Sequence, residues 1–160
     1  MKTTFTNARL IDPEAGTDTL GWLTIDKGKI TATGIGKAPE QGIDCGGKCL
    51  APGFVDIGVK VSEPGDRHKD YFRSAGLAAA AGGVTTMVTR PDTNPSIDSP
   101  EILEFVNRRA NEASPVRVLP MSALTKARAG REMVEIGFML DAGAVAFTDC
   151  DHVVQDNKVL

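Results

Sequence analysis

Hydrophobic and polar side chains alternate in short runs over the first 50 residues, a period that is typical of β-strands. We predict strands at residues 3–6, 9–11, 21–25 and 30–34, separated by turn-forming residues such as those at 12–16. The stretch Asp26-Lys27-Gly28-Lys29 predicts a tight hairpin. Together these runs indicate a small β module.

From residue 51 onward, short apolar strands alternate with longer segments of helical period. The expected strands lie at 54–61, 84–89, 116–121 and 143–148. The expected helices lie at 70–81, from Ser99-Pro100 onward, and at 129–142. Alternation of this kind predicts a parallel sheet covered by helices, so the fold class is α/β.

The helical segments also predict which side chains face the core. In the helix after Pro100 the apolar positions at helical spacing are Ile102, Val106, Ala110 and Ala113. In the helix at 129–142, Met133, Ile136 and Leu140 share one face. Four strands and three helices make about half of an eight-stranded barrel, which typically takes ~250 residues.

We therefore predict two domains: a small β module at residues 1–50 and the first half of a (β/α)8 barrel, with about four parallel strands, at residues 51–160. A half barrel leaves an unpaired edge strand on each side. Three explanations remain open. The chain is a fragment of a longer one, or it pairs with another half in an oligomer, or it closes in a way that the sequence does not show.

Composition narrows the classes of partner. The net charge of −3, without a basic stripe, argues against nucleic acid as a ligand. No apolar run reaches the roughly 20 residues that span a bilayer, and the N-terminus lacks the apolar core of a signal peptide, so we expect a cytoplasmic protein without membrane contact. Cys45 and Cys49 resemble half of a zinc knuckle, but neither His68 nor His152 lies at zinc-site spacing from a cysteine, which favours reduced thiols.

The strand at 54–61 carries the most informative chemistry. Strand alternation places Asp56, Gly58 and Lys60 on one side. Its Pro-Gly-Phe-Val-Asp opening, Pro52 to Asp56, resembles the first barrel strand of the amidohydrolases, where Pro-Gly-Phe-Val-Asp-x-His-x-His holds a catalytic metal. The two histidine places are Gly58 and Lys60 here. Glycine offers no ligand, and an ammonium group repels a cation.

Further motifs make the chain similar to the first part of the dihydroorotases, members of the amidohydrolase superfamily. The motifs are Glu63-Pro64-Gly65, Ala80-Ala81-Gly82-Gly83-Val84-Thr85-Thr86, Pro91-Asp92-Thr93-Asn94-Pro95, Val116-Arg117-Val118-Leu119-Pro120 and Gly143-Ala144-Val145-Ala146-Phe147-Thr148-Asp149. The resemblance implies a barrel preceded by a small β-sandwich. It also implies zinc chemistry, in which the metal turns a bridging water into the nucleophile that opens a cyclic amide.

Carried over place by place, the resemblance implies that substrate and metal positions have changed. Ser62 stands where the family has a carboxylate-gripping arginine, and a neutral hydroxyl cannot replace a guanidinium fork. Asp92 stands in place of a substrate-contacting asparagine and would repel an anionic substrate. The metal-binding aspartate falls on Cys150, although a one-residue slip would return it to Asp149. Later ligands and the proton-transfer aspartate would lie beyond residue 160.

Several of these residues have a second interpretation. Lys60 is either a catalytic amine or, as we expect, a structural cation that faces Asp56 or Asp149 and takes the electrostatic place of the metal. Cys150 is either a redox or metal thiol or, as we expect, a small buried side chain. The motifs Glu63-Pro64-Gly65 and Asn94-Pro95 form turns in either case, so they support the fold rather than an activity.

Two functions follow from this pattern. In the first, the chain is a non-catalytic dihydroorotase homologue of pyrimidine biosynthesis, binds no cofactor and serves as a structural partner of aspartate transcarbamoylase. In the second, it belongs to an active zinc-dependent cyclic amidohydrolase that converts dihydroorotate and water to carbamoyl aspartate, with ligands from residues absent here. We favour the first, because metal and substrate positions are changed while the framework is kept.

Overall fold

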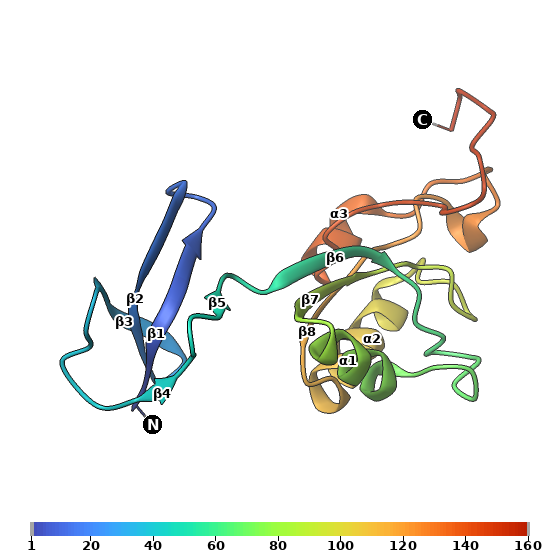
Figure 1. Cartoon of the computed structure of the whole chain (residues 1–160). Helices are drawn as coiled ribbons and strands as arrows, with labels where there is room; N and C mark the ends of the chain where they lie inside the picture. Colours follow the sequence, from blue (N-terminus) through green and yellow to red (C-terminus); the bar gives the residue numbers. More distant parts are fainter. Residues whose placement is uncertain (1, 160) are drawn as a thin grey trace. The chain divides into compact units, whose positions relative to one another are not determined.

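The computed structural model describes residues 2–159, which fold into two compact units that divide between Pro52 and Gly53. β1 to β5 belong to the first unit, and the elements from β6 to α3 belong to the second (Figure 1). No helix among the described residues is long and apolar enough to cross a membrane.

The first unit is one five-stranded sheet. Its strands are β1 (Lys2–Asp12), β2 (Thr17–Asp26), β3 (Lys29–Ile35), β4 (Ile43–Asp44) and β5 (Cys49–Leu50). The order is β3-β2-β1-β4, and β5 also pairs with β1. The antiparallel β1–β2 and β2–β3 pairs are hairpins, whereas β4 and β5 run parallel to β1. Within residues 2–159, the predicted sandwich is therefore represented by one layer.

Two local features of this sheet follow from its turn residues. The predicted hairpin is confirmed: Lys27 and Gly28 have φ of 49° and 75°, the paired positive values of a type I′ turn between β2 and β3. The separate strands predicted at 3–6 and 9–11 form the single strand β1. A register shift between Phe5 and Ala8, with Asn7 at a φ of 52°, interrupts the pairing without ending the strand.

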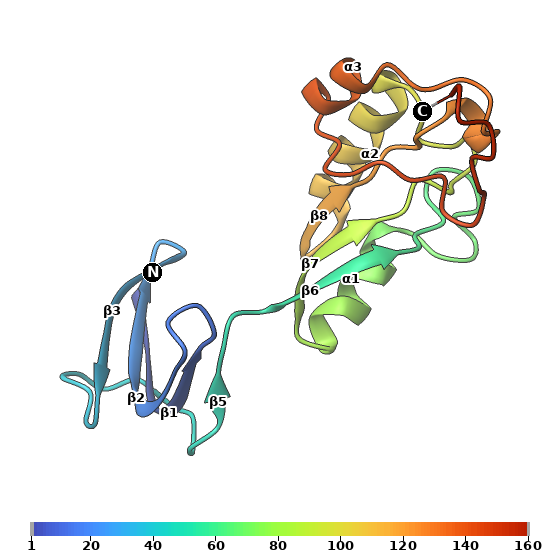
Figure 2. The ribbon, with the colours of Figure 1, turned by 90° about the horizontal axis from the view of Figure 1, so that it is seen from above.

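The second unit is built on a three-stranded parallel sheet, as the strand–helix alternation predicted. Its strands are β6 (Phe54–Val59), β7 (Val84–Thr89) and β8 (Arg117–Pro120), and their spatial order follows their sequence order. The helices α1 (Phe72–Ala81) and α2 (Pro100–Ala113) connect neighbouring strands and lie together on one face of the sheet (Figures 1 and 2). α1 and β7 agree with the predicted segments to within two residues, and α2 begins at the predicted Pro100.

The predicted fourth strand and third helix are less regular. Residues 145–148 run beside β8, with Val145 N–H donating to Pro120 O (3.1 Å) and Thr148 N–H donating to Ser122 O (3.0 Å), but only one bridge, Ser122–Phe147, is formed. The helix predicted at 129–142 is too long, because α3 covers only Ile136–Asp141. Ahead of it, residues 124–134 fold back on themselves, with a bridge between Thr125 and Met133, and the backbone amides of this stretch are used there.

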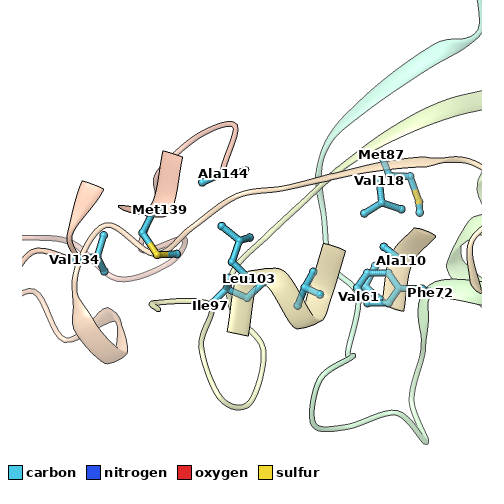
Figure 3. Close-up of a cluster of buried hydrophobic side chains, with 11 residues drawn as sticks. Val61, Phe72, Met87, Ile97, Leu103, Ala110, Val118, Val134, Met139 and Ala144 are labelled. Atoms are coloured by element: carbon cyan, nitrogen blue, oxygen red, sulfur yellow. The ribbon is translucent and has the colours of Figure 1, made fainter. Parts of the chain in front are cut away.

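The core lies between the sheet and its helices. On α2 the buried positions are Leu103, Val106 and Ala110. Val106 and Ala110 were predicted, Leu103 was missed, and the predicted Ile102 and Ala113 are only partly buried. On α3 the prediction was wrong, because Met139 is fully buried while Leu140 is 53% exposed. Figure 3 shows the core cluster, whose members are Val61, Phe72, Met87, Ile97, Leu103, Val106, Ala110, Val118, Val134, Met139 and Ala144.

Strand β6 is an edge of this sheet, and it carries exposed apolar side chains. Phe54, Val55 and Ile57 are 68%, 59% and 72% exposed. Since β7 pairs with only one side of β6, the other side presents free backbone groups within the described residues. This is the open edge that the sequence predicted.

The packing of α1 against the end of α2 can be tested with two glycines that lie in helices. A Cβ on Gly76 would lie 2.5 Å from Ser114 Oγ and 2.6 Å from Pro115 Cδ, whereas a Cβ on Gly137 in α3 would meet nothing within 4 Å. Alanine in a helix is favoured over glycine by up to ~1 kcal/mol. We expect Gly137→Ala to raise the free energy of unfolding by that order, and Gly76→Ala to lower it by about 1–3 kcal/mol through overpacking.

Urea unfolding followed by circular dichroism measures both variants. An equal gain in stability for Gly76→Ala and Gly137→Ala would show that α1 and the segment after α2 do not pack as closely as described.

Candidate functional site

The candidate site lies at the carboxyl ends of the parallel strands, the edge of such sheets where ligands usually bind. Gly58 has a φ of +93° and sits at a register shift between Ile57 and Val59 of β6. An extra residue here interrupts regular strand alternation. The predicted placement of Asp56, Gly58 and Lys60 on one side therefore does not hold, because Lys60 follows the bulge and lies beyond the end of β6.

Lys60 pairs with a different carboxylate from the two that were predicted. Its Nζ lies 3.0 Å from Oδ2 of Asp92, rather than next to Asp56 or Asp149. Arg90 Nη2 lies 2.9 Å from the same Asp92 oxygen. Asp92 is 5% exposed at its side chain, so the two cations that directly follow β6 and β7 meet on one buried carboxylate. We call the region at the carboxyl ends of the parallel strands the mouth, and Lys60, Arg90 and Asp92 the mouth triad.

The mouth triad and the adjacent Thr89 are incompletely hydrogen-bonded within residues 2–159. Asp92 Oδ1, Arg90 Nε and Thr89 Oγ1 are buried without a hydrogen-bond partner. Unpaired buried polar groups each cost about 1–3 kcal/mol. The ionic attraction within the triad offsets the cost of these unpaired groups at the end of β7. Lys60 contributes less of this attraction than Arg90, because Lys60 is 61% exposed and water screens its charge.

An open pocket of about 460 Å³ lies next to the triad. It is lined by Gly58, Arg90, Met121, Ala146, Phe147, Thr148, Cys150 and Asp151. Burial opposes the charge on Arg90, but contact with Cys150 and the negative charge of Asp92 outweigh it, so the pKa of Arg90 is raised. A hydrogen bond from its own backbone amide and the charges of His152 and Arg128, whose Nη1 lies 3.2 Å away, lower the pKa of Asp151.

The structure separates the roles of Asp149 and Cys150, the two candidates for the metal-binding aspartate position. Asp149 is 4% exposed. Its Oδ1 accepts hydrogen bonds from the backbone amides of Leu124 and Thr125, both at 3.0 Å, and its Oδ2 accepts one from the Thr125 hydroxyl. It thereby fixes the loop after β8. Cys150, at a φ of 59°, instead lines the pocket and is only partly buried, rather than buried as expected.

The other substrate-position residue and the loop motifs are placed as follows. Ser62 is partly buried and makes no side-chain hydrogen bond within residues 2–159. The loop of Pro64 and Gly65 contacts that of Asn94 and Pro95: Asn94 N–H donates to Pro64 O at 3.3 Å. Gly65, at a φ of +103°, leaves no room for a Cβ next to the Asn94 backbone. The two motifs therefore hold each other in place.

Glu63 has a role that the sequence analysis missed. It is 1% exposed, and its Oε2 accepts a hydrogen bond from Phe72 N–H (3.2 Å) at the start of α1. Its Oε1 lies 3.1 Å from Arg109 Nε on α2 and 3.3 Å from Arg67 Nε. Hydrogen bonds to Glu63 and Glu112 raise the pKa of Arg109. No local signal in the sequence indicated this role, because Glu63 lies outside the first turn of the helix predicted at 70–81, where a helix N-terminus attracts negative charge.

The residues at the mouth do not fit the zinc that the resemblance implies. Within residues 2–159, no three His, Cys, Asp or Glu side chains come together as possible metal ligands. At the two strand positions, Gly58 has no donor atom and Lys60 places an ammonium group on Asp92. His152 Nδ1 instead contacts Arg128 O at 2.7 Å. Metal ligation requires neutral or anionic donors, which these positions lack.

Comparison with known proteins assigns the chain to a family. A family model described as dihydro-orotase-like matches residues 47–159. A dihydroorotase-like protein of Pseudomonas aeruginosa is 39% identical over 96% of this chain, and a dihydroorotase of Bacillus cytotoxicus is 40% identical over 98%. The chain spans 37% of the length of each. The chain belongs to the dihydroorotase-like family.

A solved structure supports the same α/β fold. The L-hydantoinase of Arthrobacter aurescens is similar with a TM-score of 0.77 at 26% identity, covering 91% of this chain and 32% of that protein. The match therefore includes only part of the hydantoinase fold.

The structural role of Glu63 can be separated from ordinary surface pairing, because Glu63 and Glu112 contact the same Arg109. Glu63→Gln keeps the side chain's size but removes the charge that two guanidinium groups face in a buried position. We expect this variant to lose about 3 kcal/mol of unfolding free energy, as for a broken buried ion pair. Glu112 is 55% exposed, so Glu112→Gln should cost less than ~1 kcal/mol.

Denaturant unfolding of the two variants at neutral pH checks this difference. Equal small losses would mean that Glu63 does not connect the β6 loop with α1 and α2.

Proposed function

We propose that this chain is a non-catalytic dihydroorotase homologue that acts as a structural partner of aspartate transcarbamoylase in pyrimidine biosynthesis, in the cytoplasm. The observation that carries the proposal is the mouth triad. Two cationic groups, Lys60 Nζ and Arg90 Nη2, share the buried carboxylate of Asp92 at the strand ends. In a zinc-dependent hydrolase of this family we expect a cation-binding set of histidines and carboxylates there instead.

The charges at the mouth argue against both the metal and the substrate of such an enzyme. A bound divalent cation would lie near the Lys60 and Arg90 groups, which repel it. The carboxylate that these groups hold occupies the place of a neutral asparagine, so an anionic substrate would meet a negative charge there. We infer that residues 53–160 are the first part of a (β/α)8 barrel whose mouth is closed to this chemistry by the triad.

The framework supports a structural role. Glu63, the contacts between Pro64 and Asn94, and the Asp149 network all maintain the shape of the strand-end loops through contacts between residues of this chain. A structural subunit requires a stable outer surface rather than an intact mouth. These internal contacts supply that stability.

Restoring the two histidines tests whether the mouth has lost more than its two metal-binding side chains. In Gly58→His/Lys60→His we expect no stoichiometric zinc and no hydrolysis of dihydroorotate. A non-glycine residue at a φ of +93° costs of order 1–3 kcal/mol and does not project its side chain as an extended strand residue does. Ser62 and Asp92 are also unchanged in this variant.

The matched control is Gly58→Ala/Lys60→Ala, which removes the ammonium group without adding imidazoles. Metal content after dialysis against zinc, and the rate of dihydroorotate hydrolysis, are measured for both variants and the parent. One equivalent of zinc together with turnover, in the parent or the histidine variant, would support the zinc-dependent amidohydrolase instead.

The partnership is tested by size-exclusion chromatography with light scattering, on the protein alone and mixed with aspartate transcarbamoylase of the same organism. We expect a shared peak of defined mass. The Gly58→Ala/Lys60→Ala variant should co-elute equally well, because the proposed role does not use the mouth. Separate peaks for the parent protein and the transcarbamoylase would contradict the structural role.

A further inference from the structure

A second pocket lies on the outer helical layer of the unit that begins at Gly53, between the start of α1 and the later part of α2. Its volume is about 380 Å³. We call it the basic pocket; its lining residues are Arg67, Tyr71, Arg73, Arg109, Glu112 and Ala113. Three of the six carry guanidinium groups. None of these residues lines the pocket next to the mouth triad.

Buried Glu63 orients two of the three arginines. Its Oε1 binds Nε of Arg67 at 3.3 Å and Nε of Arg109 at 3.1 Å. Contact through Nε leaves the terminal Nη groups for other partners. Arg109 uses Nη1 for Glu112 (3.0 Å), whereas Arg67 forms an ion pair with no carboxylate other than Glu63 within residues 2–159.

Arg73 is the least constrained of the three. It is the second residue of α1, is exposed, and forms no ion pair or side-chain hydrogen bond with any described residue. Within residues 2–159, the three guanidinium groups are therefore balanced by two carboxylates in contact with them, those of Glu63 and Glu112. The basic pocket keeps one positive charge in excess and has unused N–H donors.

The chemistry of these donors indicates the kind of group that fits. Guanidinium is planar, presents paired N–H groups that match a carboxylate, and is weakly hydrated, which makes arginine common in protein interfaces. Arg109 already holds two carboxylates, Glu63 at 3.1 Å and Glu112 at 3.0 Å, so the spacing in this pocket suits carboxylate oxygens. Tyr71, 39% exposed, adds an aromatic wall of a type that is enriched in interfaces.

We propose that the basic pocket docks an acidic side chain of the partner protein, with Arg73 and the terminal nitrogens of Arg67 as its donors. This inference rests on the proposed structural function and names the surface through which it acts. It predicts that binding weakens as ionic strength rises, because the donors are largely exposed.

The pocket itself is tested with a hexaglutamate peptide as the probe, followed by NMR of the arginine Nε–H resonances. We expect the peptide to shift the resonances of Arg67 and Arg73. Arg73→Glu should weaken peptide binding about tenfold or more, since it turns an attraction into a repulsion. An acidic residue in the first turn of a helix is favourable, so this variant should fold normally.

The matched control is Arg131→Glu, the same charge change at an exposed residue without an ion pair in the described chain. It should leave peptide binding unchanged. Equal weakening in Arg73→Glu and Arg131→Glu would show a general charge effect and would overturn the assignment. Stronger binding of inorganic phosphate than of the peptide would also overturn it, because the site would then take a free anion.

Co-elution with aspartate transcarbamoylase separates this inference from the function on which it rests. If the parent protein co-elutes and Arg73→Glu does not, while Arg131→Glu does, both stand. Co-elution of all three proteins would remove the docking role and keep the structural function. If the parent itself fails to co-elute, the structural function fails, and with it the docking role of the pocket.

Discussion

The carboxylate of Glu63 is the contact on which the rest of the second unit depends. A glutamate with 1% exposure must be compensated, and here the compensation comes from three separate segments: the first amide of α1, Arg109 on α2 and Arg67 in the intervening loop. One side chain therefore connects the end of β6 to both covering helices. Val61, two residues before Glu63, and Phe72, whose amide donates to it, are both members of the core cluster.

The contacts that hold the strand-end loops in place do not involve the mouth triad. Asp149 is satisfied by the loop after β8, and the Pro64 and Asn94 loops hold each other through backbone contacts. Lys60 and Arg90, in contrast, pair with Asp92, and neither belongs to the core cluster. Side chains at the mouth can therefore change while the loops keep their shape, because different atoms are responsible for each.

Much of the fold was predictable from local pattern. α1, α2 and β7 have strong periodicity and clear ends, such as Gly82-Gly83 and Ser99-Pro100, and the structure agrees with them. α3 was not predictable at its start, because the backbone of 124–134 is used in a bridge between Thr125 and Met133 that depends on tertiary contact. The bulge at Gly58 was missed for a related reason. A glycine in a strand permits a positive φ, but its presence in the sequence does not show that the backbone adopts one.

The candidate site shows the same division. Its position at the strand ends followed from the motifs, but its partners did not, because a salt bridge joins residues that are distant in sequence. Lys60 was expected to pair with a carboxylate, and it pairs with Asp92 in the loop after β7. The bulge at Gly58 changes the direction of the side chains that follow it, which the predicted alternation did not include. Glu63 was assigned to a turn although its neighbours in space, Arg67 and Arg109, lie four and 46 residues away. Charge pairs of this kind join residues that are far apart in sequence, so local sequence patterns do not reveal them and only the folded structure does.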